Sequence, residues 1–411
     1  MSSNEKGGTF MTMQEMGLPE YYTVAGHKLE AGCMDHEDVH FCIQCTTVEE
    51  VKAYAEELEK AGFTQYDHNE LSAGSEAPYF TNLFYTYVKE DKQIFISWFA
   101  ALHVVHVVVM PAKALPVTTK PVLTAEDTTA PIFTQLQLKG GLCLIAQLAD
   151  ASFVIVDGGN YTAEDVQRLY DFMKDKTPQG SKPVVAMWLF THMHCDHIDL
   201  AAHFIKEYAG QVEIKSFAQQ FQDCKTIQLV IEDIDSSLNF KNILEENIRE
   251  YYGDADYYTL HTGQKYYFKG MELEILWTGD DMYPAALDSF NELSVACRMT
   301  FDSGKTAVIL GDCSHDPCRN LAEIYGDYLK SDVLQLAHHG LIGGNKRLYQ
   351  YIDPEVCFWA TNEARFKGEL AGQVYQWCIG EGGLDYNAWI RDPKVRVRQH
   401  YHNSITTTIN M

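Results

Sequence analysis

Residues 192–197 read His-Met-His-Cys-Asp-His and come directly after an apolar run. A run that is short and rich in branched and aromatic side chains predicts a strand buried on both faces. His192 and His194 are two residues apart, so their imidazoles point to the same side while the chain stays extended. Asp196 and His197 follow where a helical pattern begins. Imidazoles and a carboxylate this close together indicate a site for a divalent cation.

Two later segments also end in residues that can bind metals. A buried-strand pattern over 306–310 leads to Asp312, and a second strand pattern over 332–337 leads to His338 and His339. The carboxyl ends of parallel strands meet at one edge of a sheet, where open α/β proteins place their sites. We therefore expect these residues and the hexapeptide to lie together at one edge.

Length, charge and cysteine usage limit the classes of protein. The chain has 411 residues, which favours two domains, and a formal net charge of −25. Such acidity disfavours long nucleic acids as partners and leaves a small-molecule substrate as the expectation. No stretch approaches the roughly 20 apolar residues of a membrane span, and no apolar signal segment opens the chain. The eleven cysteines are scattered, as is typical of reduced thiols, so we expect a cytoplasmic protein without membrane association.

The patterning divides the chain into two units. A capping box at Thr47 opens a helical stripe, and apolar strand patterns flank it, which predicts a small α+β domain over 20–112. Its role is open: it could bind substrate, a partner or a second subunit, and thus support an oligomer. Prolines and threonines predict a linker over 113–131. Strands that alternate with helices predict an α/β domain over 132–411.

Four motifs follow one another in the second unit: Asp157-Gly-Gly, the hexapeptide, Gly311-Asp312 and His338-His339-Gly340. In this order they resemble the metallo-β-lactamase-fold hydrolase superfamily over residues 132–411. The His-His-Gly ending and the Asn-Glu-Leu-Ser segment at 291–294 resemble one branch, that of the competence-protein C-terminal domains and phosphorylcholine esterases. The resemblance implies an α/β fold, a four-layer αββα metallo-β-lactamase sandwich, with two divalent metal ions. Zinc is the first expectation, with manganese or iron as alternatives.

The resemblance also implies six metal ligands: His192, His194, Asp196, His197, Asp312 and His338. The first two would bind one ion, the next two the other, and Asp312 would bridge the pair. His338 comes first off its strand and would complete the second site, while His339 would reach toward substrate. The reverse assignment of these two histidines stays open. Asp196 would orient or deprotonate the attacking water, and His339 would protonate the leaving group.

One departure concerns the metal held by His192 and His194. Many members of the superfamily supply a third histidine to this ion, whereas the corresponding position here is Asn291. An amide oxygen is a weaker ligand for zinc than imidazole. Asn291, His261 or a water thus remain alternatives for the third ligand. Asp157 is expected to orient loops or accept the second N–H of a ligating imidazole.

The motifs favour a metal-dependent hydrolase, with a small or locally exposed phosphate ester as the first substrate class. A lactone, ester or amide hydrolase, including a β-lactam-type enzyme, is the alternative on the same centre. A non-catalytic metal-binding regulatory protein is a third hypothesis. The glycine-rich segment 340–344 is interpreted as an anion-binding loop or a plain connection, and the acidic segment 227–256 as a solvated helical face.

Overall fold

A computed structural model describes residues 12–21, 30–35, 38–72, 81–221, 230, 234–341, 343–367 and 387–411. Ile342 of the glycine-rich segment and residues 227–229 and 231–233 of the acidic segment lie outside these ranges. In the described part of the chain, no helix combines the length and the apolar character that a membrane crossing requires.

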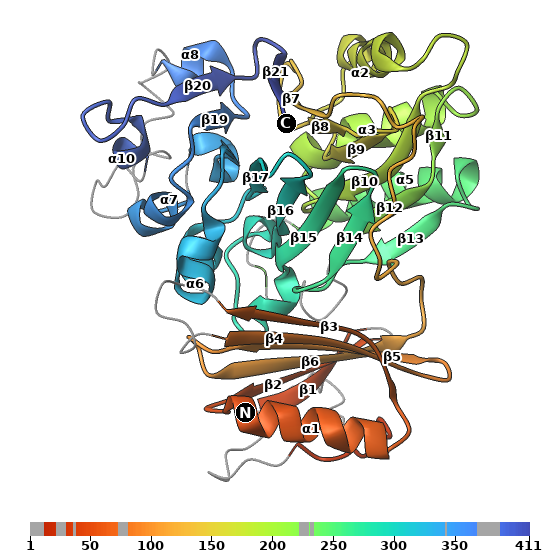
Figure 1. Ribbon diagram of the computed structural model, residues 1–411, viewed down its shortest axis with the longest axis vertical. Coiled ribbons are helices and arrows are strands. Elements are labelled where there is room, and N and C mark those ends of the chain that lie inside the picture. The colour runs from red at the N-terminus through yellow and green to blue at the C-terminus, as the bar shows by residue number, and fades with distance from the viewer. Residues whose placement is uncertain are drawn as a thin grey trace, which may run out of the picture.

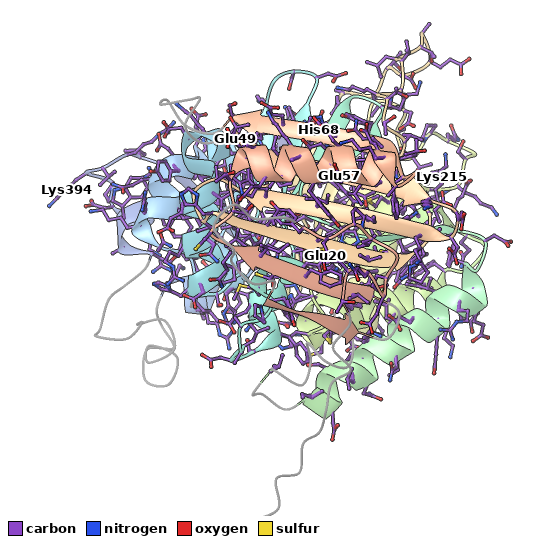
Figure 2. All side chains as sticks on the ribbon, turned by 90° about the horizontal axis from the view of Figure 1, so that it is seen from below. Glu20, Glu49, Glu57, His68, Lys215 and Lys394 are labelled. Carbon is purple, nitrogen blue, oxygen red and sulfur yellow. The ribbon has the colours of Figure 1, made fainter. Side chains whose placement is uncertain are left out.

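The N-terminal unit is an antiparallel sheet with one long helix on its outer face (Figures 1 and 2). Its strands are ordered β1-β2-β6-β5-β4-β3. Their bounds are β1 (Glu30–Asp35), β2 (Asp38–Gln44), β3 (Thr64–Ser72), β4 (Thr81–Lys89), β5 (Lys92–Phe99) and β6 (Val104–Pro111). Helix α1 (Val48–Lys60) begins at the predicted capping box, in which Thr47 and Glu50 each accept a backbone N–H of the other. Its exposed Glu49 and Glu57 face away from the sheet (Figure 2).

The remaining described strands form two mixed sheets that lie face to face (Figure 1). The first is ordered β13-β12-β10-β9-β8-β7-β21, with the short β11 beside β10. Its strands are β7 (Ile132–Gln135), β8 (Leu144–Gln147), β9 (Phe153–Val156), β10 (Val184–Phe190), β11 (Glu213–Ile214), β12 (Ser216–Gln219), β13 (Asp256–Thr259) and β21 (Thr407–Asn410). The second, ordered β14-β15-β16-β17-β18-β19-β20, holds β14 (Lys265–Phe268), β15 (Met271–Trp277), β16 (Ala296–Phe301), β17 (Thr306–Ile309), β18 (Val333–Gln335), β19 (Val356–Trp359) and β20 (Gln399–His402).

Helices cover the outer faces of both sheets. The first sheet is covered by α2 (Ala163–Lys176), α3 (Cys195–Glu207) and α5 (Ile234–Tyr251), and the second by α6 (His315–Tyr325) and α7 (Lys346–Ile352) (Figure 1). Short elements connect the strands: η1 (Gly279–Met282), η2 (Phe290–Leu293), η3 (Gly326–Leu329), η4 (Ala337–Gly340), α8 (Glu363–Phe366) and α10 (Ala388–Arg391). The predicted α/β fold, a four-layer αββα sandwich preceded by a small α+β unit, is confirmed. The boundaries at 112 and 131 stay a prediction.

The burial of both faces of β10 explains why its sequence is apolar throughout. Met187 and Leu189 point into the core between the two sheets, whereas Trp188 and Phe190 point toward the helices. The Trp188 ring packs edge-on against Phe204 of α3, with 5.5 Å between the ring centroids. Because both faces of β10 are buried, it has no polar side until the chain leaves the sheet. The strand thus holds the following hexapeptide in a fixed position.

The N-terminal sheet packs against the second unit through β4, β5 and β6 (Figure 1). Gly263 has a φ of +87°, and a Cβ there would collide with the ring of Phe84 on β4. Asn82 of β4 also donates its amide to the carbonyl oxygen of Ile324 at 3.1 Å. The two units are therefore in direct contact through buried groups.

Candidate metal centre

Three strand ends bring the candidate ligands together. His192 lies two residues after the end of β10, and Asp196 and His197 lie in the first turn of α3. Asp312 follows β17, which runs parallel to β18, and His339 lies in η4 directly after β18. This is the arrangement expected where strand ends share one edge.

The chain after β18 has an unusual backbone. His338 and His339 both have positive φ values, +47° and +58°. A non-glycine residue in this left-handed region is energetically costly and persists only where the surroundings enforce it. The two consecutive left-handed residues aim the rings of the histidine pair in different directions, at 59° between ring planes.

Four residues place ligand atoms within 4.8 Å of one another: Asp196, His197, Asp312 and His339. We call them the central group. His339 Nε2 lies 2.9 Å from Asp196 Oδ2 and 3.2 Å from Asp312 Oδ2, and His197 Nε2 lies 3.2 Å from Asp312 Oδ1. All are buried except Asp196, whose side chain is 31% exposed. Two imidazoles and two carboxylates suit zinc and other transition-type divalent ions.

Buried atoms without hydrogen bonds mark this group as a site that a cation fits. Nε2 of His197, Nε2 of His339 and Oδ1 of Asp312 are buried, and although each is close to an oppositely charged group, none makes a hydrogen bond of acceptable geometry with a described residue. Buried polar atoms in folded proteins are almost always paired, so each exception needs a cause. A divalent ion between these atoms would satisfy all three at once. The donor set therefore fits the implied metal.

The electrostatics of the central group point the same way. Burial opposes a charge on His197, but Asp312, Asp157 and Asp196 outweigh burial and hold its pKa well above the usual range. Burial likewise opposes the ionised form of Asp312, yet His197 and His339 hold the pKa of this carboxyl well below its usual range. Without a metal, protons on the histidines compensate the buried carboxylates, and a divalent cation would take the place of these protons.

Asp157 supports the group from behind, as predicted. Its Oδ2 accepts from His197 Nδ1 at 2.7 Å and from Thr191 Oγ1 at 2.7 Å, while its Oδ1 accepts the Thr191 backbone N–H at 2.7 Å. This acceptor fixes the His197 tautomer that leaves Nε2 free for a metal. Thr191 is a functional residue that was not expected from the sequence. The available signal was a polar residue at the end of a buried apolar run, directly before the hexapeptide.

The other sequence-predicted ligands border the central group. His192 Nε2 lies 3.0 Å from His194 Nδ1 and 4.0 Å from Asp312 Oδ2. His338 Nε2 lies 3.8 Å from Asp312 Oδ2. The structure therefore brings all six expected ligands and His339 to one edge, but it places His339 rather than His338 in the central group.

The two candidates for a third ligand of the first ion lie in different places. Asn291 is in η2, next to Phe290, whose ring centroid lies 6.0 Å from that of His194. Asn291 Oδ1 is buried and has no hydrogen-bond partner among the described residues. His261 instead lies between the two units, where its Nδ1 contacts Asp280 at 2.9 Å. It is not in the central group.

The cysteines beside the ligands are thiols. Burial raises the pKa of Cys313 well above its usual range, and Cys313 Sγ donates to the carbonyl oxygen of Ser294 at 3.6 Å. Burial also raises the pKa of Cys195. Neither belongs to the central group. These shifts disfavour a thiolate ligand at either position.

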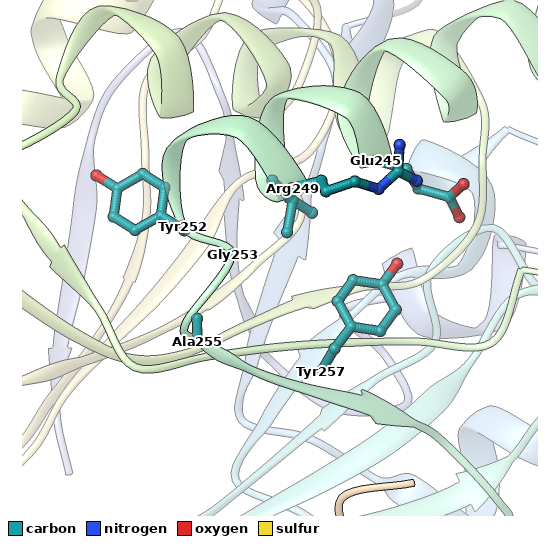
Figure 3. A pocket seen from close by; sticks show the side chains of 7 residues that line it. Glu245, Arg249, Tyr252, Gly253, Ala255 and Tyr257 are labelled. Atoms are coloured by element: carbon teal, nitrogen blue, oxygen red, sulfur yellow. The ribbon is translucent and has the colours of Figure 1, made fainter.

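A separate pocket lies between the end of α5 and β13 (Figure 3). Its volume is about 280 Å³, and it is lined by Glu245, Ile248, Arg249, Tyr252, Gly253, Ala255 and Tyr257. None of the candidate ligands lines it, so it is not part of the metal centre.

Comparisons with known proteins found likenesses only among solved structures. No protein-family model matches the chain, and no curated protein matches it. The metallo-β-lactamase-fold protein YhfI from Bacillus subtilis is 13% identical, with a TM-score of 0.33 over 56% of this chain and 85% of that one. CmlA, a diiron β-hydroxylase from Streptomyces venezuelae, is 11% identical, with a TM-score of 0.39 over 69% of this chain and 54% of that one. Unliganded yeast PDE1 is 13% identical, with a TM-score of 0.35 over 59% of this chain and 95% of that one.

Proposed function

We propose that the chain is a metal-dependent hydrolase that cleaves a small or locally exposed phosphate ester. The observation that carries the proposal is the central group, in which buried imidazole and carboxylate atoms converge without hydrogen-bond partners. The layered fold and the order of motifs agree with the resemblance to metallo-β-lactamase-fold hydrolases. The preference for phosphate esters is supported by the resemblance of the His-His-Gly ending to the esterase branch.

In this proposal the residues of the central group would hold one divalent ion, with zinc favoured over manganese or iron. His192 and His194 would hold a second ion, to which Asp312, whose Oδ2 lies 4.0 Å from His192 Nε2, would contribute a carboxylate. A bound divalent ion would lower the pKa of a coordinated water and so provide a nucleophile at neutral pH.

The protein side chains have separate tasks in the proposed reaction. Asp196 is the most exposed member of the central group, so it can orient the attacking water and accept its proton. The geometry favours the reverse of the first assignment for the histidine pair. His339 is the ligand, and His338, whose side chain is 23% exposed, is the group that can give a proton to the leaving oxygen.

The cellular setting is part of the same proposal. The acidic composition supports a small-molecule substrate rather than a long nucleic acid. We keep the cytoplasm as the location, without membrane association. We also keep an oligomer formed through the N-terminal sheet as a hypothesis for the oligomeric state.

The test is hydrolysis of bis-p-nitrophenyl phosphate by full-length protein reconstituted with Zn²⁺ or Mn²⁺, beside a lactone and a β-lactam. We expect metal-dependent release of p-nitrophenol. The Asp312→Ala variant should lose both bound metal and turnover, whereas Asp199→Asn, on the same edge but outside the central group, should keep both. Turnover of only the lactone or the β-lactam would refute the phosphoesterase proposal. A metal-loaded protein that hydrolyses none of them would indicate a regulatory metal protein.

A further inference from the structure

A cluster of aromatic and basic side chains lies at the same sheet edge as the metal centre. Strands β18, β19 and β20 are parallel neighbours, so their carboxyl ends meet there. Trp359 ends β19, and its indole N–H donates to His400 Nδ1 on β20 at 3.1 Å. Phe366 of α8 packs edge-on against Trp359, with 5.4 Å between the ring centroids.

Two backbone contacts connect this cluster to the candidate ligands. Gly340, which follows His339, lies so close to Trp359 that a Cβ at Gly340 would collide with the indole ring. Asn403, directly after β20, donates its amide to the carbonyl oxygen of Gly141 at 2.9 Å. Gly141 in turn packs against the backbone of Asp196. The cluster thus borders the metal centre through residues adjacent to two of its ligands.

Arg391 lies on this aromatic surface. Its guanidinium carbon is 4.3 Å from the centroid of the Trp359 ring and 5.8 Å from that of Phe366. Helix α10, which carries Arg391, follows its N-cap residue Asn387, and the Asn387 amide donates to the carbonyl oxygen of Gly340 at 2.8 Å. Four helical residues rise only about 6 Å, so Arg391 is held within one turn of the His-His-Gly segment.

Among the described residues, Arg391 differs from two neighbouring arginines, which both pair with carboxylates. Arg396 contacts Asp353 at 2.8 Å, and Arg398 contacts the same carboxylate at 2.8 Å. Arg391 is exposed, and no carboxylate among the described residues forms an ion pair with it. In a chain with a net charge of −25, a guanidinium that lies over an aromatic ring, borders the candidate ligands and forms no ion pair with a described carboxylate is a specific electrostatic feature.

We propose that Arg391, held over the ring of Trp359 and beside that of Phe366, binds an acidic group that the substrate carries in addition to its scissile ester. Stacking on an aromatic face leaves the in-plane N–H groups of the guanidinium free, and their fork matches a carboxylate or a phosphate group. The inference rests on the proposed hydrolase function and deepens it. It assigns the substrate at least two anionic or esterified acid groups, one at the metal centre and one at Arg391.

The test measures anion binding, without turnover. Zinc-loaded full-length protein is titrated calorimetrically with pyrophosphate and inorganic phosphate, and with succinate and acetate. Each pair compares a ligand with two acidic groups to one with a single group. The variants are Arg391→Met, which keeps the volume and removes the charge, and Arg391→Lys, which keeps the charge and removes the planar fork. Lys394→Met, an exposed basic residue three positions further along, is the control.

In one of the two pairs, we expect Arg391→Met to weaken binding of the ligand with two acidic groups by about tenfold or more, as the loss of a charged hydrogen bond predicts. Loss with pyrophosphate identifies a phosphate group, and loss with succinate a carboxylate. Arg391→Lys should lie in between, and Lys394→Met should match the wild type. Bound zinc and thermal unfolding show whether each variant is folded. If Arg391→Met does not fold, the affinities of Arg391→Lys decide the test. Unchanged affinities for both longer ligands would overturn the proposal.

The two proposals fail in different ways. If the wild type hydrolyses no phosphate ester but binds pyrophosphate or succinate through Arg391, the proposed function fails while the anion site stands. If bis-p-nitrophenyl phosphate is hydrolysed and Arg391→Met changes no affinity, the phosphoesterase stands. Arg391 is then only a partner of the aromatic rings.

Discussion

Replacing Asp157 by Asn should weaken metal binding although Asp157 is not a ligand. Three donors converge on this buried carboxylate, namely the N–H and hydroxyl of Thr191 and Nδ1 of His197. An amide offers one acceptor and one donor in the same space. In either orientation, its NH₂ group faces a Thr191 N–H or His197 Nδ1–H donor. The variant must therefore lose a charged hydrogen bond or turn His197 to the tautomer with a proton on Nε2.

The size of the effect follows from these contacts. A hydrogen bond to a charged group contributes about 1.5–3 kcal/mol, and the buried donor left behind adds a penalty of similar size. His197 with its proton on Nε2 cannot bind a metal through that atom. Loss of such a supporting partner typically weakens metal affinity about 10- to 100-fold. We expect a decrease in zinc affinity within this range for Asp157→Asn, together with a lower thermal unfolding temperature of the metal-free protein.

The assay is competition for zinc against a chromophoric chelator of known affinity, at constant pH, with far-ultraviolet circular dichroism to verify folding. Asp199→Asn is the control, because Asp199 lies on α3, the helix that carries His197, and pairs with the half-exposed His203 at 3.7 Å, outside the central group. Zinc affinity equal to the wild type in folded Asp157→Asn protein would show that Asp157 does not set the His197 tautomer.

Three further predictions concern the histidine pair, the contact between the units and a buried carboxyl. His339→Ala should weaken zinc binding by more than about 100-fold, whereas His338→Ala should keep its zinc and lose turnover. Metal analysis and kinetics test this, and the opposite pattern would make His338 the ligand. Gly263→Ala should lower the free energy of unfolding by about 2 kcal/mol or more, because its Cβ collides with a phenylalanine ring of β4. Gly304 has the same φ of +87° but open space around it, so Gly304→Ala measures the backbone strain alone. Equal urea midpoints for the two variants would show that the collision with the ring does not contribute. Burial raises the pKa of Asp281 to about 8. The folded chain then holds a proton that the unfolded chain loses above its ordinary pKa, so stability falls as pH rises toward 8. Asp281→Asn should remove this fall. Its free energy of unfolding in urea, compared with that of the wild type, should therefore rise by about 1.4 kcal/mol per pH unit between pH 5 and 7. A difference between the two proteins that does not change with pH would contradict the raised pKa.

The amino-acid sequence alone determined the types of candidate ligand and the strand ends that carry them. The apolar run of β10 has to be buried on both faces, so the hexapeptide after it has to emerge at the sheet edge. The same reasoning placed Asp312 after β17 and the histidine pair after β18. The capping box before α1 was also local information, because its two hydrogen bonds join residues three apart.

Tertiary structure alone decided which side chains meet. His338 and His339 follow the same strand, and only the left-handed backbone at both residues directs the His339 ring into the central group. Pairing with Asp280 holds His261 at the contact between the two units, which no local pattern around His261 indicated. Arg391 is connected to the candidate ligands through Trp359 and Gly340, residues distant from it in sequence. Periodicity fixes where a strand ends, but the direction of a side chain beyond that end depends on packing between segments that are distant in the chain.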